Sequence, residues 1–121
     1  MAQSAGLHEP EERLSPQLVD RHRALVSIQE ELEAVDWYDQ RVAAASDSEL
    51  ASVLAHNRDE EKEHMAMVLE WLRRHDPALD RHLRSYLFTS ESIVAEEVAA
   101  ETGATASAGS LGIGSLKGDP A

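Results

Sequence analysis

Apolar side chains recur every three or four residues along most of this chain, which is the spacing of one face of an α-helix. The first such run consists of Leu14, Leu18, Leu25, Ile28, Leu32 and Val35. The second consists of Leu50, Val53, Leu54, Val68, Trp71 and Leu72. Ser15 before Pro16 is typical of a helix N-cap followed by the first helical residue. The pattern therefore predicts a first helix from Pro16 to about Ala45.

Capping signals predict where the later helices begin and end. Ser46, followed three residues later by Glu49, forms a capping box that starts a second helix. That helix should end near His75, because a proline at position 77 disfavours helical geometry just before it. The short connection around Ala45–Asp47 makes the two helices an antiparallel hairpin. Asp76 and Pro77 then open a shorter third helix.

The remaining pattern is also helical, so the fold class is all-α. The third helix repeats its apolar residues at helical spacing through Leu79, Leu83, Tyr86 and Leu87. A weaker fourth helical piece runs from about Ser92 to Ala100. No strand pattern competes with these assignments, and no internal repeat is visible.

Two polar residues interrupt the apolar face of the second helix. Glu61 and His64 lie three residues apart in the middle of that face, as Glu-x-x-His. Burying a carboxylate there costs several kcal/mol unless it is paired or bound to a metal. A carboxylate and an imidazole one turn apart on an inward face are typical ligands in carboxylate-bridged di-iron bundles.

The first helix supplies a third candidate ligand. Glu31 follows Ile28 by three residues and precedes Val35 by four, so it lies on or beside the apolar face. A di-iron bundle takes a Glu from each of two helices and a Glu-x-x-His from each of two others. One chain holds half of that set. Two copies related by a two-fold axis complete it, so we expect the metal site at a dimer interface inside a four-helix bundle.

Composition narrows the chemistry. The chain has 121 residues, enough for one modest domain, and its net charge of −12 argues against nucleic acid and anionic membrane surfaces as partners. No cysteine is present, so carboxylates and imidazoles favour iron, manganese or zinc. We recognise no secretory signal and no membrane-spanning segment, and therefore expect a cytoplasmic location.

Several other residues have two interpretations. Glu30 and Glu33, one turn apart, are either an acidic patch near the site or an ordinary solvated face. Tyr38 lies two turns beyond Glu31 and is either a group acting at the site or a packing residue. The residues His56, Glu60 and His64 form an alternative ligand set on one helix. Glu60 and Glu63 should form surface pairs with Lys62, with Arg58 or with neighbours across the hairpin.

The two ends of the chain differ from the middle. Residues 1–14 are polar and should be flexible. Residues 15–101 carry the helical pattern, and residues 102–110 have the small, polar composition of a linker. Residues 111–118 follow, in which Leu111, Ile113 and Leu116 alternate with glycine and serine. Such a tail should be disordered alone and is either a docking peptide or a frayed terminus.

These features together resemble the encapsulated ferritins. The resemblance is carried by Glu30–Asp39, by His56–His64 and by the tail segment Leu111–Lys117, which is similar to the targeting peptide of encapsulin cargo. It covers nearly the whole chain and implies a ferritin-like four-helix bundle formed by dimerisation. It also implies a ring-shaped decamer of five dimers inside an encapsulin shell.

The resemblance further implies a ferroxidase, which oxidises Fe(II) to Fe(III) with dioxygen at a di-iron site between two subunits. Its implied ligands are Glu31, Glu61 and His64, with Glu30 and Glu33 as an acidic entry site. Trp37 and Tyr38 correspond to the aromatic pair beside the site. Two other functions use the same residues: a non-catalytic iron or zinc buffer, and a helical adaptor whose buried Glu and His fix the dimer register.

Overall fold

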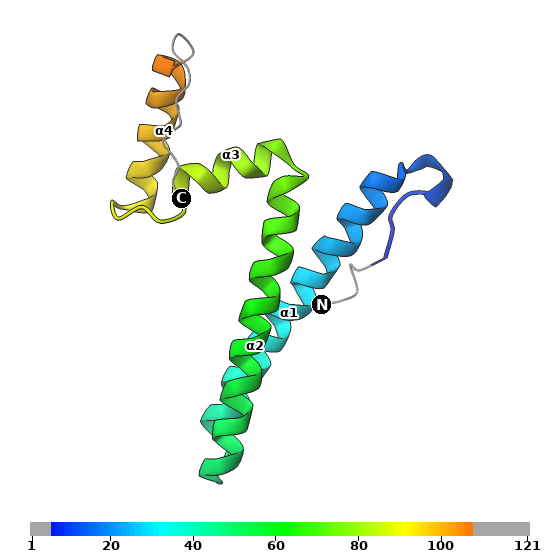
Figure 1. Cartoon of the computed structure of the whole chain (residues 1–121), viewed down its shortest axis with the longest axis vertical. Coiled ribbons are helices and arrows are strands. Elements are labelled where there is room, and N and C mark those ends of the chain that lie inside the picture. Colours follow the sequence, from blue (N-terminus) through cyan, green and yellow to red (C-terminus); the bar gives the residue numbers. More distant parts are fainter. Residues whose placement is uncertain (1–5, 108–121) are drawn as a thin grey trace. The chain divides into compact units, whose positions relative to one another are not determined.

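The computed structural model describes residues 6–107, and every regular element within that range is helical. A 3₁₀ turn, η2, spans Glu11–Arg13. It is followed by α1 (Pro16–Ala44), α2 (Ser48–Arg74), α3 (Pro77–Tyr86) and α4 (Ile93–Ser107) (Figure 1). The predicted all-α class is confirmed. The chain divides into two compact units, Met1–Asp76 and Pro77–Ala121, which are described separately.

Helix α1 begins where the sequence predicts. The Ser15 Oγ accepts a hydrogen bond from the backbone N–H of Leu18 at 3.1 Å, and Pro16 occupies the first helical position. This cap satisfies one of the N–H groups that a helix start leaves without an internal partner. The helix ends at Ala44, one residue before the predicted end.

The start of α2 corrects the sequence prediction by one residue. Asp47, not Ser46, is the N-cap, and its Oδ2 accepts from the N–H of Leu50 at 2.8 Å. A carboxylate makes a stronger, charge-assisted cap than a hydroxyl, and it also interacts favourably with the positive end of the helix dipole. The helix ends at Arg74, and His75 caps it while its ring stacks on Trp71 with centroids 4.0 Å apart.

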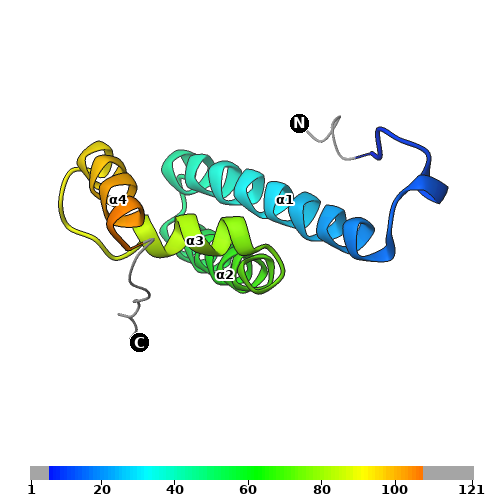
Figure 2. The ribbon, with the colours of Figure 1, turned by 90° about the horizontal axis from the view of Figure 1, so that it is seen from above.

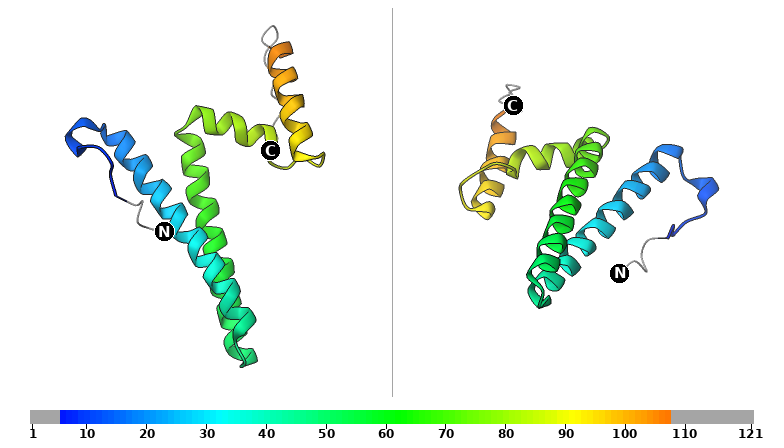
Figure 3. Two further views of the ribbon diagram at one scale, coloured as in Figure 1. Left: turned by 180° about the vertical axis from the view of Figure 1, so that it is seen from behind. Right: turned by 60° about the horizontal axis from the view of Figure 1, so that its bottom comes forward.

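Helices α1 and α2 form the predicted antiparallel hairpin. They lie side by side near the connection and separate toward their far ends (Figures 1 and 3). Viewed from above, α2 is seen nearly along its axis while α1 runs away from it (Figure 2). The part of the hairpin nearest the connection therefore provides most of the direct packing between the two helices.

The hairpin leaves much of its apolar face exposed. Within the described part of the chain only Val19 and Leu72 are buried. Leu25 and Leu32, seven residues apart on α1, are 51% and 50% exposed, and Met67 of α2 is 60% exposed. Soluble monomers seldom expose a long apolar strip, and such strips mark interaction surfaces. One hairpin is thus an incomplete core.

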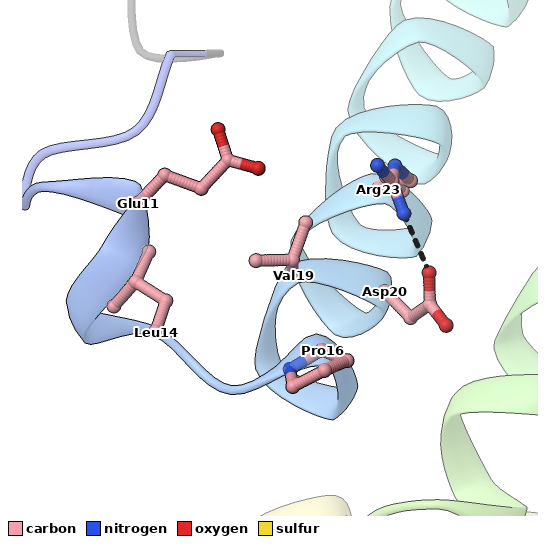
Figure 4. Close-up of a pocket in the computed structure, with 6 residues that line it drawn as sticks. All are labelled: Glu11, Leu14, Pro16, Val19, Asp20 and Arg23. Atoms are coloured by element: carbon pink, nitrogen blue, oxygen red, sulfur yellow. Dashed lines mark hydrogen bonds and ion pairs between the residues drawn. The ribbon is translucent and has the colours of Figure 1, made fainter.

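The N-terminal segment, predicted to be flexible over residues 1–14, contains an ordered turn. Residues Glu11–Arg13 form η2, and the backbone N–H of Leu14 closes it on the carbonyl of Glu11 at 2.9 Å. Leu14 and Val19 both line an open pocket of about 300 Å³ between this turn and the start of α1 (Figure 4). Val19, which is buried, thus lies beside the segment that precedes α1.

The second unit contains α3 and α4. Helix α3 begins at Pro77, as predicted, and ends at Tyr86. Helix α4 begins after Ser92, whose Oγ accepts from the N–H of Ala95 at 3.0 Å. It continues to Ser107, so the helical region extends past the predicted boundary at residue 101 and into the predicted linker. The rest of that linker and the tail segment lie outside the described residues.

None of the helices within residues 6–107 is both long enough and apolar enough to cross a bilayer.

Candidate metal centre

Three predicted ligands meet on the facing sides of α1 and α2. Glu31 from α1 and the pair Glu61 and His64 from α2 each offer one ligand atom, and these atoms all lie within 4.8 Å of one another. Glu61 and His64 lie close because three residues make nearly one helical turn. Glu31 reaches them because the antiparallel hairpin places the middle of α1 opposite the middle of α2.

The α2 pair is partly open to solvent. The His64 Nδ1 lies 3.7 Å from the Glu61 Oε1, too far for a strong hydrogen bond but close enough for both atoms to bind one cation. The Glu61 side chain is 27% exposed and the His64 side chain 46% exposed. A ligand or a second subunit can therefore reach both groups.

Glu31 is the least satisfied polar group of the cluster. Its Oε1 is buried and has no hydrogen-bond partner. Burial, followed by repulsion from Glu61, raises the pKa of the Glu31 carboxyl, and attraction to His64 opposes that rise. An unpaired buried oxygen facing a second carboxylate is unfavourable alone, because neither group compensates the other. A cation between them removes both costs.

The donor set suits a hard or borderline divalent metal. Bonds from carboxylate oxygen and imidazole nitrogen to such ions are about 2.0–2.2 Å, so two ligands of one ion lie at most about 4.4 Å apart. The observed limit of 4.8 Å is slightly larger, and small rotations of the side chains close the difference. The residues therefore fit a metal ion, and carboxylate plus imidazole is the ligand chemistry of iron, manganese and zinc sites.

The other predicted site residues lie outside this cluster. Glu30 is exposed, and its charge contributes the smallest of the causes that raise the Glu31 pKa. Glu33 and Tyr38 are half-buried on α1. The guanidinium carbon of Arg41 lies 5.1 Å from the centroid of the Tyr38 ring, a cation–π contact that the sequence did not suggest. Their predicted roles at the site stay predictions.

The alternative ligand set on α2 is not brought together. The His56 Nε2 lies 3.4 Å from the Glu60 Oε2, with side chains 73% and 50% exposed, as in an ordinary surface pair. His64 turns instead toward Glu61. Within residues 6–107, the three-residue group able to hold a metal ion consists of Glu31, Glu61 and His64.

The expected surface pairs of α2 form with different partners. Arg58 bonds Asp59 through Nε at 3.2 Å and Asp39 of α1 through Nη1 at 3.0 Å. Lys62 lies 3.6 Å from the same Asp59 carboxylate. The acceptors are thus aspartates and not Glu60 or Glu63. The contact between α2 and α1 was missed, because residues 19 apart in sequence share no local signal.

Comparison with known proteins agrees with this architecture. The chain matches the EncFtn-like family over residues 6–90. It is 60% identical to an "Encapsulated ferritin-like protein" of Rhodospirillum rubrum, with 100% of this chain and 95% of that protein covered. It is 49% identical to a "Ferritin-like protein" of Thermotoga maritima, covering 90% and 96% of the two chains.

Two further matches extend the comparison. The "Encapsulin nanocompartment cargo protein EncC" of Myxococcus xanthus is 32% identical over about half of each protein. The crystal structure of protein ne0167 from Nitrosomonas europaea superposes with a TM-score of 0.71 at 60% identity, covering 73% of this chain and 97% of that one. A chain with this hairpin and this group of candidate ligands, matched over most of its length by relatives of this kind, belongs to the encapsulated ferritin (EncFtn-like) family.

Proposed function

We propose that this protein is a ferroxidase that binds Fe(II) as its substrate at a di-iron site between two subunits and oxidises it with dioxygen. The observation that carries the proposal is the convergence of Glu31, Glu61 and His64, with one buried Glu31 oxygen lacking any partner. A buried orphan acceptor beside two further ligands is best explained by a cation. Family membership favours iron among the metals that the ligands suit.

The site requires a second copy of the chain. Three ligand groups are too few for two metal ions, and a two-fold partner doubles the set to two Glu31, two Glu61 and two His64 side chains. The exposed leucines of α1 offer an apolar surface for that partner. Five such dimers in a ring complete the decamer that the resemblance implies.

The protein's contribution is binding, charge and access. By the family resemblance, Glu61 would be shared between the two iron ions, and Glu31 and His64 would each hold one of them. Carboxylates stabilise the higher charge of Fe(III) relative to Fe(II), which favours loss of one electron from each ion. Dioxygen accepts those electrons, together with protons from water. Coordination positions not filled by the six side chains remain available to water and dioxygen.

Two neighbouring groups assist. Glu30 and Glu33 place negative charge beside the path to the centre, where it attracts cations in a chain whose net charge is already −12. Tyr38 acts at the edge of the site, held by its contact with Arg41. Its phenol is able to hydrogen-bond a ligand or to supply an electron.

The protein itself is delivered to a compartment. Relatives of this chain are named as encapsulated and as encapsulin cargo. The tail segment Leu111–Lys117 carries the aliphatic residues that would anchor such a protein to an encapsulin shell. The protein then works inside a nanocompartment in the cytoplasm, where the shell stores the iron mineral.

The alternative is a metal-binding module without catalysis, such as an iron or zinc buffer. It uses the same three ligands and predicts the same metal stoichiometry. The two functions differ in one measurable respect, since only the ferroxidase consumes dioxygen when Fe(II) is present.

The test is anaerobic addition of Fe(II) to the purified chain, followed by air, with iron oxidation, dioxygen consumption and oligomer size measured together. Glu61→Ala and His64→Ala should each slow oxidation at least about tenfold, because loss of even an outer partner costs a metal site that much. Glu63→Ala is the matched control, since Glu63 is exposed on the same helix and outside the cluster. Wild-type protein that binds iron without accelerating its oxidation would establish the buffer instead.

A further inference from the structure

Arg58 links the two helices beside the metal centre. Its Nη1 donates to the Asp39 Oδ1 at 3.0 Å, while its Nε donates to the Asp59 Oδ1 at 3.2 Å. Asp39 belongs to α1, whereas Asp59 is the next residue on α2. The guanidinium is therefore held from two directions, and its planar group leaves little freedom to rotate. Its side chain is only 23% exposed.

The position of this link matters for the ligands. Arg58 precedes Glu61 by three residues, so the two Cα atoms differ by about 4.5 Å along α2 and share nearly one face. Asp39 lies on α1 between Glu31 and the connection to α2. The link is thus on the connection side of the metal centre, and beyond the centre the helices separate (Figures 1 and 3).

From this arrangement we infer that the Arg58–Asp39 pair positions the ligands: it fixes the rotation and axial position of α2 against α1, so that Glu61 and His64 face Glu31. The inference rests on the proposed function, because it takes the three-residue cluster to be a metal centre. Arg58 and Asp39 contact no ligand atom in this role. They act through the helices that carry the ligands, as outer partners do in other metal sites.

The pair adds a constraint beyond that of the short connection. The connection holds the helices together at residues 45–47 but leaves the rotation of each helix about its axis less restricted. A contact through a rigid guanidinium adds a second fixed point, closer to the centre. A ligand displaced by about 1 Å loses much of its bond to a metal, because acceptable distances vary by only about 0.2 Å.

Arg58 also carries a positive charge near the proposed cation site. Because of this charge, the two possible effects of removing Arg58 change the metal affinity in opposite directions. If only charge mattered, removing Arg58 would strengthen metal binding, because one repulsive charge would disappear. If position matters, removing it weakens binding despite the lost repulsion. Lys62 supplies the matched control, since it adjoins Glu61 and pairs only within α2, with Asp59 at 3.6 Å, among its described contacts.

The experiment is titration of the full-length protein with Co(II), which binds the same donor types and reports coordination through its visible absorption. Arg58→Gln and Asp39→Asn should each weaken Co(II) binding by about tenfold and alter the absorption band, the effect typical of an outer partner. The double variant should bind no more weakly than either single one, because both changes remove one link. Lys62→Gln should bind as tightly as wild type or more tightly.

Wild-type affinity in Arg58→Gln, or tighter binding in both Arg58→Gln and Lys62→Gln, overturns the inference. If circular dichroism shows that Arg58→Gln loses helical content, Asp39→Asn becomes the deciding variant, because it keeps the Arg58–Asp59 bond. Native helical content together with wild-type Co(II) affinity in Asp39→Asn also overturns the inference. Fe(II) oxidation is measured separately. A wild-type protein that binds Co(II) but does not oxidise Fe(II) refutes the ferroxidase proposal alone.

Discussion

The carboxylates of Glu31 on α1 and Glu61 on α2 approach each other from opposite arms of the hairpin, with candidate ligand atoms within 4.8 Å. Two like charges at this separation repel, and the Glu31 Oε1 has no hydrogen-bond partner. The metal-free subunit therefore bears a local cost that a bound cation relieves. Stability and metal binding are linked through this contact.

The Glu31 carboxyl should make metal-free stability depend on pH. Its pKa is raised by burial and by Glu61, so the folded state holds the proton to higher pH than the unfolded chain. The metal-free protein therefore loses stability as pH rises from about 4.5, the ordinary value, through the raised pKa. Glu31→Gln should remove this loss and be more stable at pH 7 by about 0.5 kcal/mol, the scale of a like-charged pair.

The measurement is urea unfolding with a chelator present, repeated over a range of pH. With metal added, the wild type should become more stable than Glu31→Gln, because the metal stabilises the wild type but not the variant. Identical pH profiles of stability for wild type and Glu31→Gln would show that the ionised Glu31 carboxylate does not destabilise the metal-free protein.

The exposed leucines of α1 should hold the dimer together. Leu25→Asp with Leu32→Asp puts two charges into the proposed interface and should shift the population to monomers, since each buried leucine contributes about 1.5–3 kcal/mol. Sedimentation velocity gives the distribution. As a control, Ser52→Asp adds a charge at an exposed polar position of α2 and should leave the distribution of oligomers unchanged. An unchanged dimer in the double variant would place the interface elsewhere.

The acidic pair should control the rate of iron entry more than the chemistry. Glu30→Gln with Glu33→Gln should slow oxidation several-fold at low salt and reduce its dependence on ionic strength, because steering by charge is screened by salt. Stopped-flow absorbance at two salt concentrations separates the two effects. A double variant as inactive as Glu61→Ala would make Glu30 and Glu33 primary ligands.

The tail should carry the address for encapsulation. Deletion of Leu111–Ala121 should leave oxidation by the isolated protein intact, since the cluster lies in α1 and α2. It should abolish loading into a co-expressed encapsulin shell, and Leu116→Asp alone should weaken loading. Fusing the segment to an unrelated protein tests sufficiency. Normal loading of the truncated chain would assign the address to another surface.

Glu70 should give α2 an acid-sensitive contribution to stability. Hydrogen bonds from Arg73 and Arg74 lower the pKa of Glu70 to about 2. The stabilisation is complete above the ordinary value of 4.5 and is lost as pH falls toward 2. Glu70→Gln should therefore be less stable than wild type at neutral pH, with the difference shrinking toward pH 2 in thermal unfolding. A difference that is constant across this range would contradict the assignment.

The predictable features are those with local causes. Ser15 and Pro16 start α1, and Pro77 starts α3, because capping and backbone restriction act within a few residues. Helical periodicity also placed Glu31 and Glu61 on or beside the apolar faces of their helices, the sides on which the structure brings them together. These signals are strong enough to locate the starts of the helices to within about one turn.

The features that were not predicted depend on how the helices are placed against each other, or on a choice between two local structures of similar stability. The Arg58–Asp39 contact requires the relative rotation of two helices, which sequence spacing leaves undetermined. Asp47 replaces Ser46 as the cap because two good capping residues stand side by side, and the charge that favours the aspartate is a small effect. Helix α4 extends past residue 101 although the small residues there are typical of linkers, since alanine also has the highest helix propensity.

The hairpin has few buried residues: within the described chain only Val19 and Leu72 are buried. This affects how long an unpaired subunit survives in the cell. A newly made subunit without a partner opens readily, and an opened helix is a substrate for proteases. Pairing with a second subunit protects the chain from proteolysis. The steady-state amount of protein should therefore rise more than in proportion to its rate of synthesis. Degradation would then remove the solitary chains, each of which carries only one copy of the proposed ligand set.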